Sequence, residues 1–168
     1  MIQVGAAPDT VARALEQVEI GMQRAGRKRH GVARLLVITA RVDADKVRVI
    51  DYMRPSAAGM YRHRHAAILL QTVGLQVPDT LPTYPRPYSD LSHAVDWEEA
   101  KRLTRFVPDE AVEAILAVGS AAEIIDRVRA LAALDIDAIW WRDEGSYTRP
   151  VELVEALSPQ VLPRVRGH

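Results

Sequence analysis

The chain has 168 residues, and its 22 lysines and arginines balance 22 aspartates and glutamates, so its formal net charge is zero. A balanced chain lacks the basic excess of nucleic-acid-binding domains, and we expect no nucleic-acid partner. The absence of cysteine excludes disulfides, thiolate metal sites and thiol nucleophiles. No apolar run approaches the roughly 18 residues of a membrane helix, and Met1 to Gly5 lack a basic leader and an apolar signal core. We therefore expect a cytoplasmic protein with no membrane partner.

The first quarter of the chain predicts a strand, a helix and a second strand. The apolar stub Ile2–Val4 is typical of a strand. Apolar residues then recur at helical spacing from Pro8, which suits a first helical position, to Arg24. Gly26 follows as the expected left-handed residue after the helix. The uninterrupted apolar run within Val32–Val42 indicates a strand that is buried on both faces.

The middle of the chain predicts a helical region and a long connection. Residues 44–73 carry an apolar stripe at helical spacing, with a break or kink expected at Pro55. Residues 74–92 are rich in proline and are predicted to be a loop insertion. A loop of this length in a compact domain is usually functional or mobile.

The last part of the chain predicts several short helices and a third strand. Ser92 is expected to cap a helix that contains Trp97, and Ser120 with Glu123 three residues later forms a capping box. The remaining expected elements are a helix from Pro108 to Leu116, a strand over residues 136–142 and an interrupted helical stretch over residues 149–166.

Strands that alternate with helices and are nearly all apolar predict an α/β protein with a parallel sheet covered by helices. Three strands are few, because such a sheet keeps two open edges. We therefore expect the chain, residues 1–168, to form a single domain that is part of a larger α/β architecture.

Three segments resemble the luciferase-like monooxygenase superfamily, and within it the oxidoreductases that use coenzyme F420, including the methylenetetrahydromethanopterin reductase-like branch. They are Val4–Pro8 with the helix to Arg27, Ser92–Trp97 running to Phe106–Glu110, and Val118–Glu123 followed by Leu131–Asp137. The third segment is similar to the family pattern "V-G-[ST]-P-E-x-V, then A-x-x-G-[VI]-D". Ala122 stands where a proline is usual and Asp135 where a glycine is usual.

The resemblance covers the chain from Ile2 to about Val165 and implies a partial (β/α)8 barrel, about its C-terminal half. The early strands of such a barrel, which supply much of the cofactor pocket and most catalytic residues, have no counterpart here, so no catalytic residue is assigned. The implied cofactor is coenzyme F420 or FMN, and the implied substrate is a small molecule. The barrel would be completed by self-association into a homo-oligomer or by a complementary N-terminal half-barrel chain.

Sites in βα barrels lie at the C-terminal ends of the strands, which selects the candidate residues. Gly5, Ala6 and Ala7 precede a helix N-terminus, where backbone N–H groups can bind a phosphate of the cofactor, although a plain turn is the alternative. Arg41 ends a strand and could clamp a carboxylate or phosphate. Its alternative is a salt bridge at the rim with Asp43 or Asp45.

Trp140 and Arg142 at the end of the last strand are the other candidate contacts to substrate or anion. Trp140 and Trp141 should point to opposite faces of the sheet, and core packing is the alternative to an aromatic wall. Arg142 beside Asp143 could be a surface ion pair. We expect no metal site, since His63 and His65 do not share a helix face and His93 offers the only further imidazole nearby.

Two functions follow from these observations. The first is the C-terminal portion of a flavin- or F420-dependent oxidoreductase, in which the cofactor carries the hydride or oxygen chemistry. The alternative is a non-catalytic remnant that binds a ligand or a barrel partner. Whether the chain is itself an enzyme is left open, and the substrate is not identified.

Overall fold

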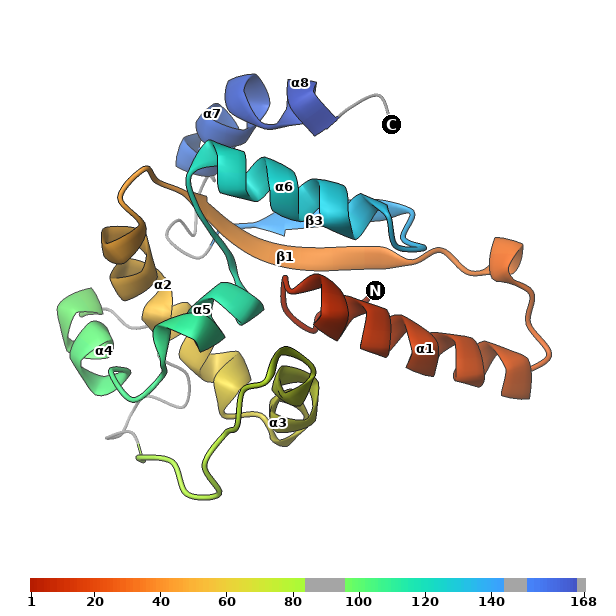
Figure 1. Cartoon of the computed structure of the whole chain (residues 1–168), viewed down its shortest axis with the longest axis horizontal. Coiled ribbons are helices and arrows are strands. Elements are labelled where there is room, and N and C mark those ends of the chain that lie inside the picture. The colour runs from red at the N-terminus through yellow and green to blue at the C-terminus, as the bar shows by residue number, and fades with distance from the viewer. Residues whose placement is uncertain (84–95, 144–150, 166–168) are drawn as a thin grey trace.

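The computed structural model describes residues 1–83, 96–143 and 151–165 (Figure 1). Its centre is a parallel sheet of three strands, in which β1 (Leu35–Val42) lies between β2 (Ala117–Gly119) and β3 (Ala138–Arg142). The expected α/β class, with three parallel strands and covering helices, is confirmed.

The first of the expected strands is reduced to one isolated bridge. The Ile2 N–H donates to the Leu35 carbonyl at 2.7 Å, and the Val37 N–H donates to the Ile2 carbonyl at 2.8 Å. The strand predicted over residues 2–4 is therefore wrong beyond Ile2, because Gly5 takes a φ of +107° and turns the chain away from the sheet.

The third strand of the sheet, β2, was not predicted as a strand. The Asp43 N–H donates to the Gly119 carbonyl at 2.8 Å, so β2 pairs with the same edge of β1 as Ile2 does, at its other end. Consecutive strands of a closed βα barrel lie side by side in chain order. Here β1 is central and β3 occupies its second edge, so the sheet is open.

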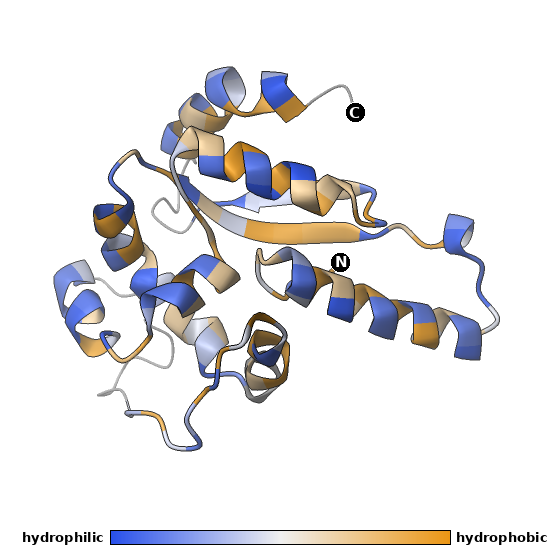
Figure 2. Ribbon diagram, viewed as in Figure 1, coloured by the Kyte–Doolittle hydropathy of each residue, from blue (hydrophilic) through white to orange (hydrophobic). Residues whose placement is uncertain are grey.

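Helices are grouped into two regions, and hydrophilic and hydrophobic residues alternate along their ribbons (Figure 2). The group near the sheet comprises α1 (Pro8–Arg24), α6 (Ala121–Ala132), α7 (Val151–Gln160) and α8 (Leu162–Val165). The group beside the sheet comprises α2 (Lys46–Tyr61), α3 (Arg64–Leu70), α4 (Trp97–Leu103) and α5 (Asp109–Ile115). Short 3-10 turns occupy residues 29–31 and 71–73.

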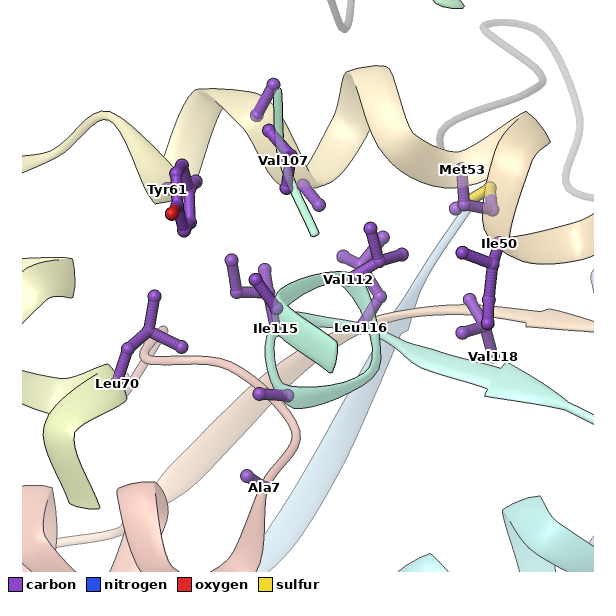
Figure 3. Packing of buried hydrophobic residues seen from close by; sticks show 14 of the residues in the cluster. Ala7, Ile50, Met53, Tyr61, Leu70, Val107, Val112, Ile115, Leu116 and Val118 are labelled. Atoms are coloured by element: carbon purple, nitrogen blue, oxygen red, sulfur yellow. The ribbon is translucent and has the colours of Figure 1, made fainter. Parts of the chain in front are cut away.

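Each group has its own core. One core joins Leu36, Ile38 and Ala40 of β1 to apolar residues of α1, α6 and α7. The other joins α2 to α5 and to β2, through residues that include Met53 and Val112 (Figure 3). Among the described helices, none combines the length and the hydropathy that a membrane span requires.

Of the break or kink predicted at Pro55, the break does not occur there. The helix α2 runs through Pro55, and the chain breaks at Arg62 and His63, where His63 adopts an extended conformation before α3. Met53 and Ala57, on either side of the proline, are completely buried in the core with α5. We attribute the continuity of α2 to this packing, which offsets the hydrogen bond lost at proline.

Local signals for helix ends agree well with the structure. Gly26 has a φ of +63° directly after the C-cap of α1, and Ser120 and Glu123 form the predicted capping box. The helix α4 is capped by Asp96, which accepts from the Glu99 N–H at 3.0 Å. The cap predicted at Ser92 lies outside the described residues.

The first part of the predicted insertion, residues 74–83, is irregular and packs onto the helices. The Leu75 N–H donates to the Leu70 carbonyl at 3.0 Å. Leu75, Val77 and Leu81 are partly buried against the core of α2 and α5. The rest of the insertion, from residue 84, lies outside the described residues.

Candidate functional site

The register of the sheet brings three of the predicted site residues to one face. Val37 pairs with Trp140 and Thr39 with Arg142, and paired residues point to the same side. Arg41, two residues after Thr39, points to this side as well. We call this surface the Trp140 face; it consists of Val37, Thr39 and Arg41 of β1 and Ala138, Trp140 and Arg142 of β3.

Trp140 is the exposed part of this face. Its side chain is 52% exposed, and Ala138 beside it is also exposed, whereas Val37 on β1 is buried. Trp141 points the other way and packs against the core of α6 and α7. The prediction that the two tryptophans occupy opposite faces is confirmed, and the core-packing role belongs to Trp141. The ring of Trp140 is accessible on its side of the sheet.

Arg41 is held between two helices at the C-terminal end of the sheet. Its Nη2 lies 2.7 Å from Oε2 of Glu152 on α7, and its guanidinium carbon lies 4.3 Å from the ring centroid of Tyr52 on α2. The Glu152 side chain is 75% exposed. An ion pair with so exposed a carboxylate is weak, so an incoming anion could replace it.

Arg41 does form a salt bridge at the rim, but its partner is Glu152. The alternative predicted from the sequence, a bridge with Asp43 or Asp45, is wrong. Asp43 instead pairs with Arg48 at 2.7 Å, and the hydrogen bonds from Arg48 hold the pKa of Asp43 below its ordinary value. Asp45 caps α2 by accepting from the Arg48 N–H at 3.0 Å. Both carboxylates are therefore engaged at the start of α2.

A small cavity of about 60 Å³ lies where β1 and β3 end. Its lining includes Arg41, Asp43, Asp143 and Glu152. This volume is too small for a ring system, because ligand pockets typically measure roughly 300–1,000 Å³.

The turn Gly5–Ala7 lies on the far edge of the sheet, beside α5. The N–H groups of Ala6 and Ala7 both donate to the Ala114 carbonyl at 2.9 Å. A phosphate could use these donors only if that contact opened. The cofactor-binding role of Gly5, Ala6 and Ala7 stays a prediction, and the structure does not bring them together with the Trp140 face.

The next residue, Pro8, lines a cavity of about 330 Å³. Of its charged groups, the sequence singled out only Glu123, as part of the Ser120 capping box. Lys46 forms ion pairs with Glu113 and, at 3.0 Å, with Glu123. Arg127 donates to the Glu113 carbonyl at 2.9 Å, and burial lowers its pKa. Lys46 lies on α2 and Glu113 on α5, whereas Glu123 and Arg127 lie on α6, so no spacing in the sequence reveals that the three helices meet here. Because the carboxylates neutralise the cations, the cluster has the character of a structural network.

The described residues contain no group of three or more histidine and acidic side chains arranged to hold a metal. His63 is exposed at the start of α3. The side chains of His65 and His93 lie outside the description.

Comparison with known proteins identifies the fold. No family model matches the chain, and no curated protein does. The coenzyme F420-dependent tetrahydromethanopterin reductase from Methanopyrus kandleri is similar with a TM-score of 0.63 and 16% identity, over 96% of this chain and 44% of the reductase. An F420-dependent secondary alcohol dehydrogenase, solved with an F420–acetone adduct, is similar with a TM-score of 0.55 and 16% identity, over 96% of this chain and 41% of the dehydrogenase.

The chain therefore spans less than half the length of these two barrel enzymes. At 16% identity the similarity shows the fold. It agrees with the partial barrel that the luciferase-like resemblance implies.

Proposed function

We propose that the chain is part of a coenzyme F420-dependent oxidoreductase and supplies one wall of the site for cofactor and substrate. The observation that carries this proposal is the Trp140 face, which combines an exposed aromatic ring with Arg41 and Arg142 at the C-terminal end of a parallel sheet. The sheet belongs to a fold similar to that of two F420-dependent enzymes. In barrels of this architecture, sites lie at that end of the strands.

The residues of the Trp140 face suit the chemistry of a deazaflavin. The ring system of Trp140 can stack on a flat heterocycle. An arginine can hold a phosphate or carboxylate through two parallel hydrogen bonds, and Arg41 would exchange Glu152 for such a group. When bound, the deazaflavin supplies the hydride chemistry. The chain would bind and orient it.

The complete enzyme requires further walls, since the chain spans only 44% and 41% of its two structural neighbours. We propose that these walls come from a second copy of the chain or from a complementary half-barrel polypeptide. The substrate would be a small molecule, and a secondary alcohol is the first to try because one neighbour is a secondary alcohol dehydrogenase. Both neighbours use coenzyme F420, and neither comparison supports FMN.

A fluorescence titration with each cofactor tests the proposal. Both cofactors fluoresce, so quenching or polarisation reports binding to the purified chain directly. We expect saturable binding of coenzyme F420 at micromolar concentrations and weaker binding of FMN. Failure of coenzyme F420 to bind, or a preference for FMN, would contradict the proposal.

The alternative, a non-catalytic chain that binds a ligand or a barrel partner, is favoured by the share of the neighbours that the chain spans. Turnover separates the two functions. An oxidoreductase should bleach the visible absorbance of oxidised coenzyme F420 when a secondary alcohol is added. A binding protein should bind the coenzyme and leave that absorbance unchanged.

A further inference from the structure

The guanidinium of Arg41 is held by an aromatic ring as well as by a carboxylate. Its central carbon lies over the ring of Tyr52 on α2, 4.3 Å from the ring centroid. A guanidinium in this position is attracted by the negative face of the ring, and the contact uses no hydrogen-bond donor. Arg41 therefore keeps its N–H groups for Glu152 or for an anion that replaces Glu152.

The two contacts of Arg41 differ in how firmly they hold it. Because the Glu152 side chain is largely exposed, water and salt weaken its ion pair with Arg41. Tyr52 is half-buried and packs against the core of α2 and α5. A cation that contacts a partly desolvated ring is held more strongly than one at an exposed ring. The contact with Tyr52 would therefore remain when Glu152 is displaced.

Trp97, the first residue of α4, fixes the Tyr52 ring. The two ring centroids are 5.5 Å apart with their planes inclined by 43°, and the Trp97 indole N–H donates to the Tyr52 carbonyl at 2.9 Å. Further along α4, Lys101 pairs with Asp51 of α2 at 2.9 Å. The helix α4 thus holds the part of α2 that carries Tyr52, and Arg41, Tyr52 and Trp97 form a row of contacts from β1 to α4.

The surroundings of Arg41 leave a place for a small anionic group. Arg41 lines the cavity of about 60 Å³ where β1 and β3 end. Asp43, in the same lining, is bound by Arg48 at 2.7 Å. Within the described part of the chain, the salt bridge of Arg41 to Glu152 is the only one that it makes. Displacement of this single exposed carboxylate therefore opens the guanidinium to the cavity.

We infer that Tyr52 is the positioning residue for Arg41: its ring, supported by Trp97, holds the guanidinium where it binds an anionic group of the ligand. The inference rests on the proposed function, in which Arg41 exchanges Glu152 for a phosphate or carboxylate. It gives α2 and α4 a part in ligand binding, although neither helix contributes to the Trp140 face. A guanidinium held in one orientation loses less conformational freedom when it forms two parallel hydrogen bonds to an anion.

Titration with inorganic phosphate, followed by NMR of the arginine Nε–H groups, tests this inference without the cofactor. The Arg41 resonance is identified as the one missing from Arg41→Lys, and the Tyr52 ring should shift it upfield. Tyr52→Leu removes the ring, so it should abolish the upfield shift and weaken phosphate binding about fivefold. Tyr52→Phe keeps the ring and should retain both the shift and, within about twofold, the affinity. The Arg48 resonance, identified in the same way, is the internal control.

Failure of this inference and failure of the proposed function give different results. If wild type binds phosphate at Arg41 but does not bind coenzyme F420, the proposed function fails and the positioning of Arg41 by Tyr52 stands. The inference would be overturned if the Arg41 resonance of wild type were not shifted upfield, if phosphate left it unmoved, or if Tyr52→Leu bound phosphate as tightly as wild type. The first two results are measured on wild type, so they decide the matter even if Tyr52→Leu does not fold.

Discussion

Asp135 stands where the luciferase-like pattern usually has glycine. It lies just before β3 and binds two arginines, Arg29 and Arg34, that precede β1 in the chain. Its carboxylate accepts from Arg29 at 2.8 Å and also pairs with Arg34, which is 4% exposed and bonded to Glu19 at 2.9 Å. Asp137 accepts the Arg34 backbone N–H at 2.6 Å. The sequence showed that Asp135 departs from the pattern, but its partners are more than 100 positions away and could not be identified from spacing.

We predict that Asp135→Asn lowers the melting temperature by a few degrees at neutral pH. Hydrogen bonds from Arg29 hold the pKa of Asp135 below its ordinary value of 3.8. The carboxylate therefore contributes stability above that value and loses it as the pH falls through the lower folded pKa. Melting curves of wild type and variant should converge in strong acid. A difference in melting temperature of equal size at neutral pH and in strong acid would contradict this assignment. Glu16→Gln, in an exposed pair with Arg13, is the control.

Gly5 is a position where the backbone itself requires glycine. Its φ is +107°, and a Cβ there would lie 2.9 Å from the Ala114 carbonyl oxygen, which accepts from Ala6 and Ala7. We expect Gly5→Ala to lower the free energy of unfolding by roughly 1–3 kcal/mol in chemical denaturation. Gly21→Ala in α1, where a Cβ meets nothing, should raise it by roughly 0.5–1 kcal/mol. Equal effects of the two substitutions would refute the strain at Gly5.

At the scale of elements, the start of α6 combines a capping box with an ion pair. Glu123 accepts the Ser120 N–H at 2.8 Å and pairs with Lys46 at 3.0 Å. The hydrogen bond from the Ser120 backbone, followed by that from Lys46, lowers the pKa of Glu123 to about 2. The charged carboxylate thus ties α6 to α2 and satisfies a backbone donor that the helix leaves open.

We predict that Glu123→Gln flattens the acid dependence of stability. Because the folded pKa of about 2 lies below the ordinary 4.5, the contribution of Glu123 is present above pH 4.5 and is lost as the pH falls toward 2. The melting temperature of the variant should fall less than that of wild type across this window, as followed by circular dichroism. Parallel curves would exclude the assignment, and Glu155→Gln, exposed on α7, is the control.

The elements that the sequence predicted correctly are those set by local chemistry. The helix beginning at Pro8, its end at Gly26 and the Ser120 capping box depend on neighbours within a few residues. The strand β2 was missed because three residues carry no periodicity and it exists through pairing with β1. Likewise, the helix does not break at Pro55, because burial of α2 against α5 outweighs a local preference.

At the scale of the whole molecule, β3 forms an edge of the sheet. The Asp137 N–H donates to the Arg34 carbonyl, so alternate backbone groups from Ala138 onward point away from β1. Within the described part of the chain no strand pairs with this edge. With Trp140 exposed beside it, the edge can pair with another chain.

We therefore predict concentration-dependent self-association of the purified chain, measured by light scattering. Trp140→Lys should shift the population toward monomer, because a lysine on an edge strand opposes pairing. Val47→Lys, at another exposed apolar position, should leave the distribution unchanged. A single monomer peak at all concentrations would contradict the prediction.

Sheet register explains how much of the candidate site could be predicted. Arg41, Trp140 and Arg142 were chosen because they end strands, and parallel pairing brings them to one face. The partners of Arg41 were not predictable, since Glu152 and Tyr52 arrive from helices distant in the sequence. Gly5–Ala7, chosen by the same reasoning, instead bonds to Ala114, because the first strand is reduced to a single bridge.

The measurement that tests the central claim most directly is the dissociation constant of coenzyme F420 for wild type and for Trp140→Leu. Leucine keeps the Trp140 face apolar but removes the flat ring, so stacking is tested apart from self-association. We predict that the substitution weakens binding by roughly fivefold or more, while Ile68→Ala, at an exposed apolar position on α3, leaves it unchanged. Equal affinities of wild type and Trp140→Leu would show that the cofactor does not bind at the Trp140 face.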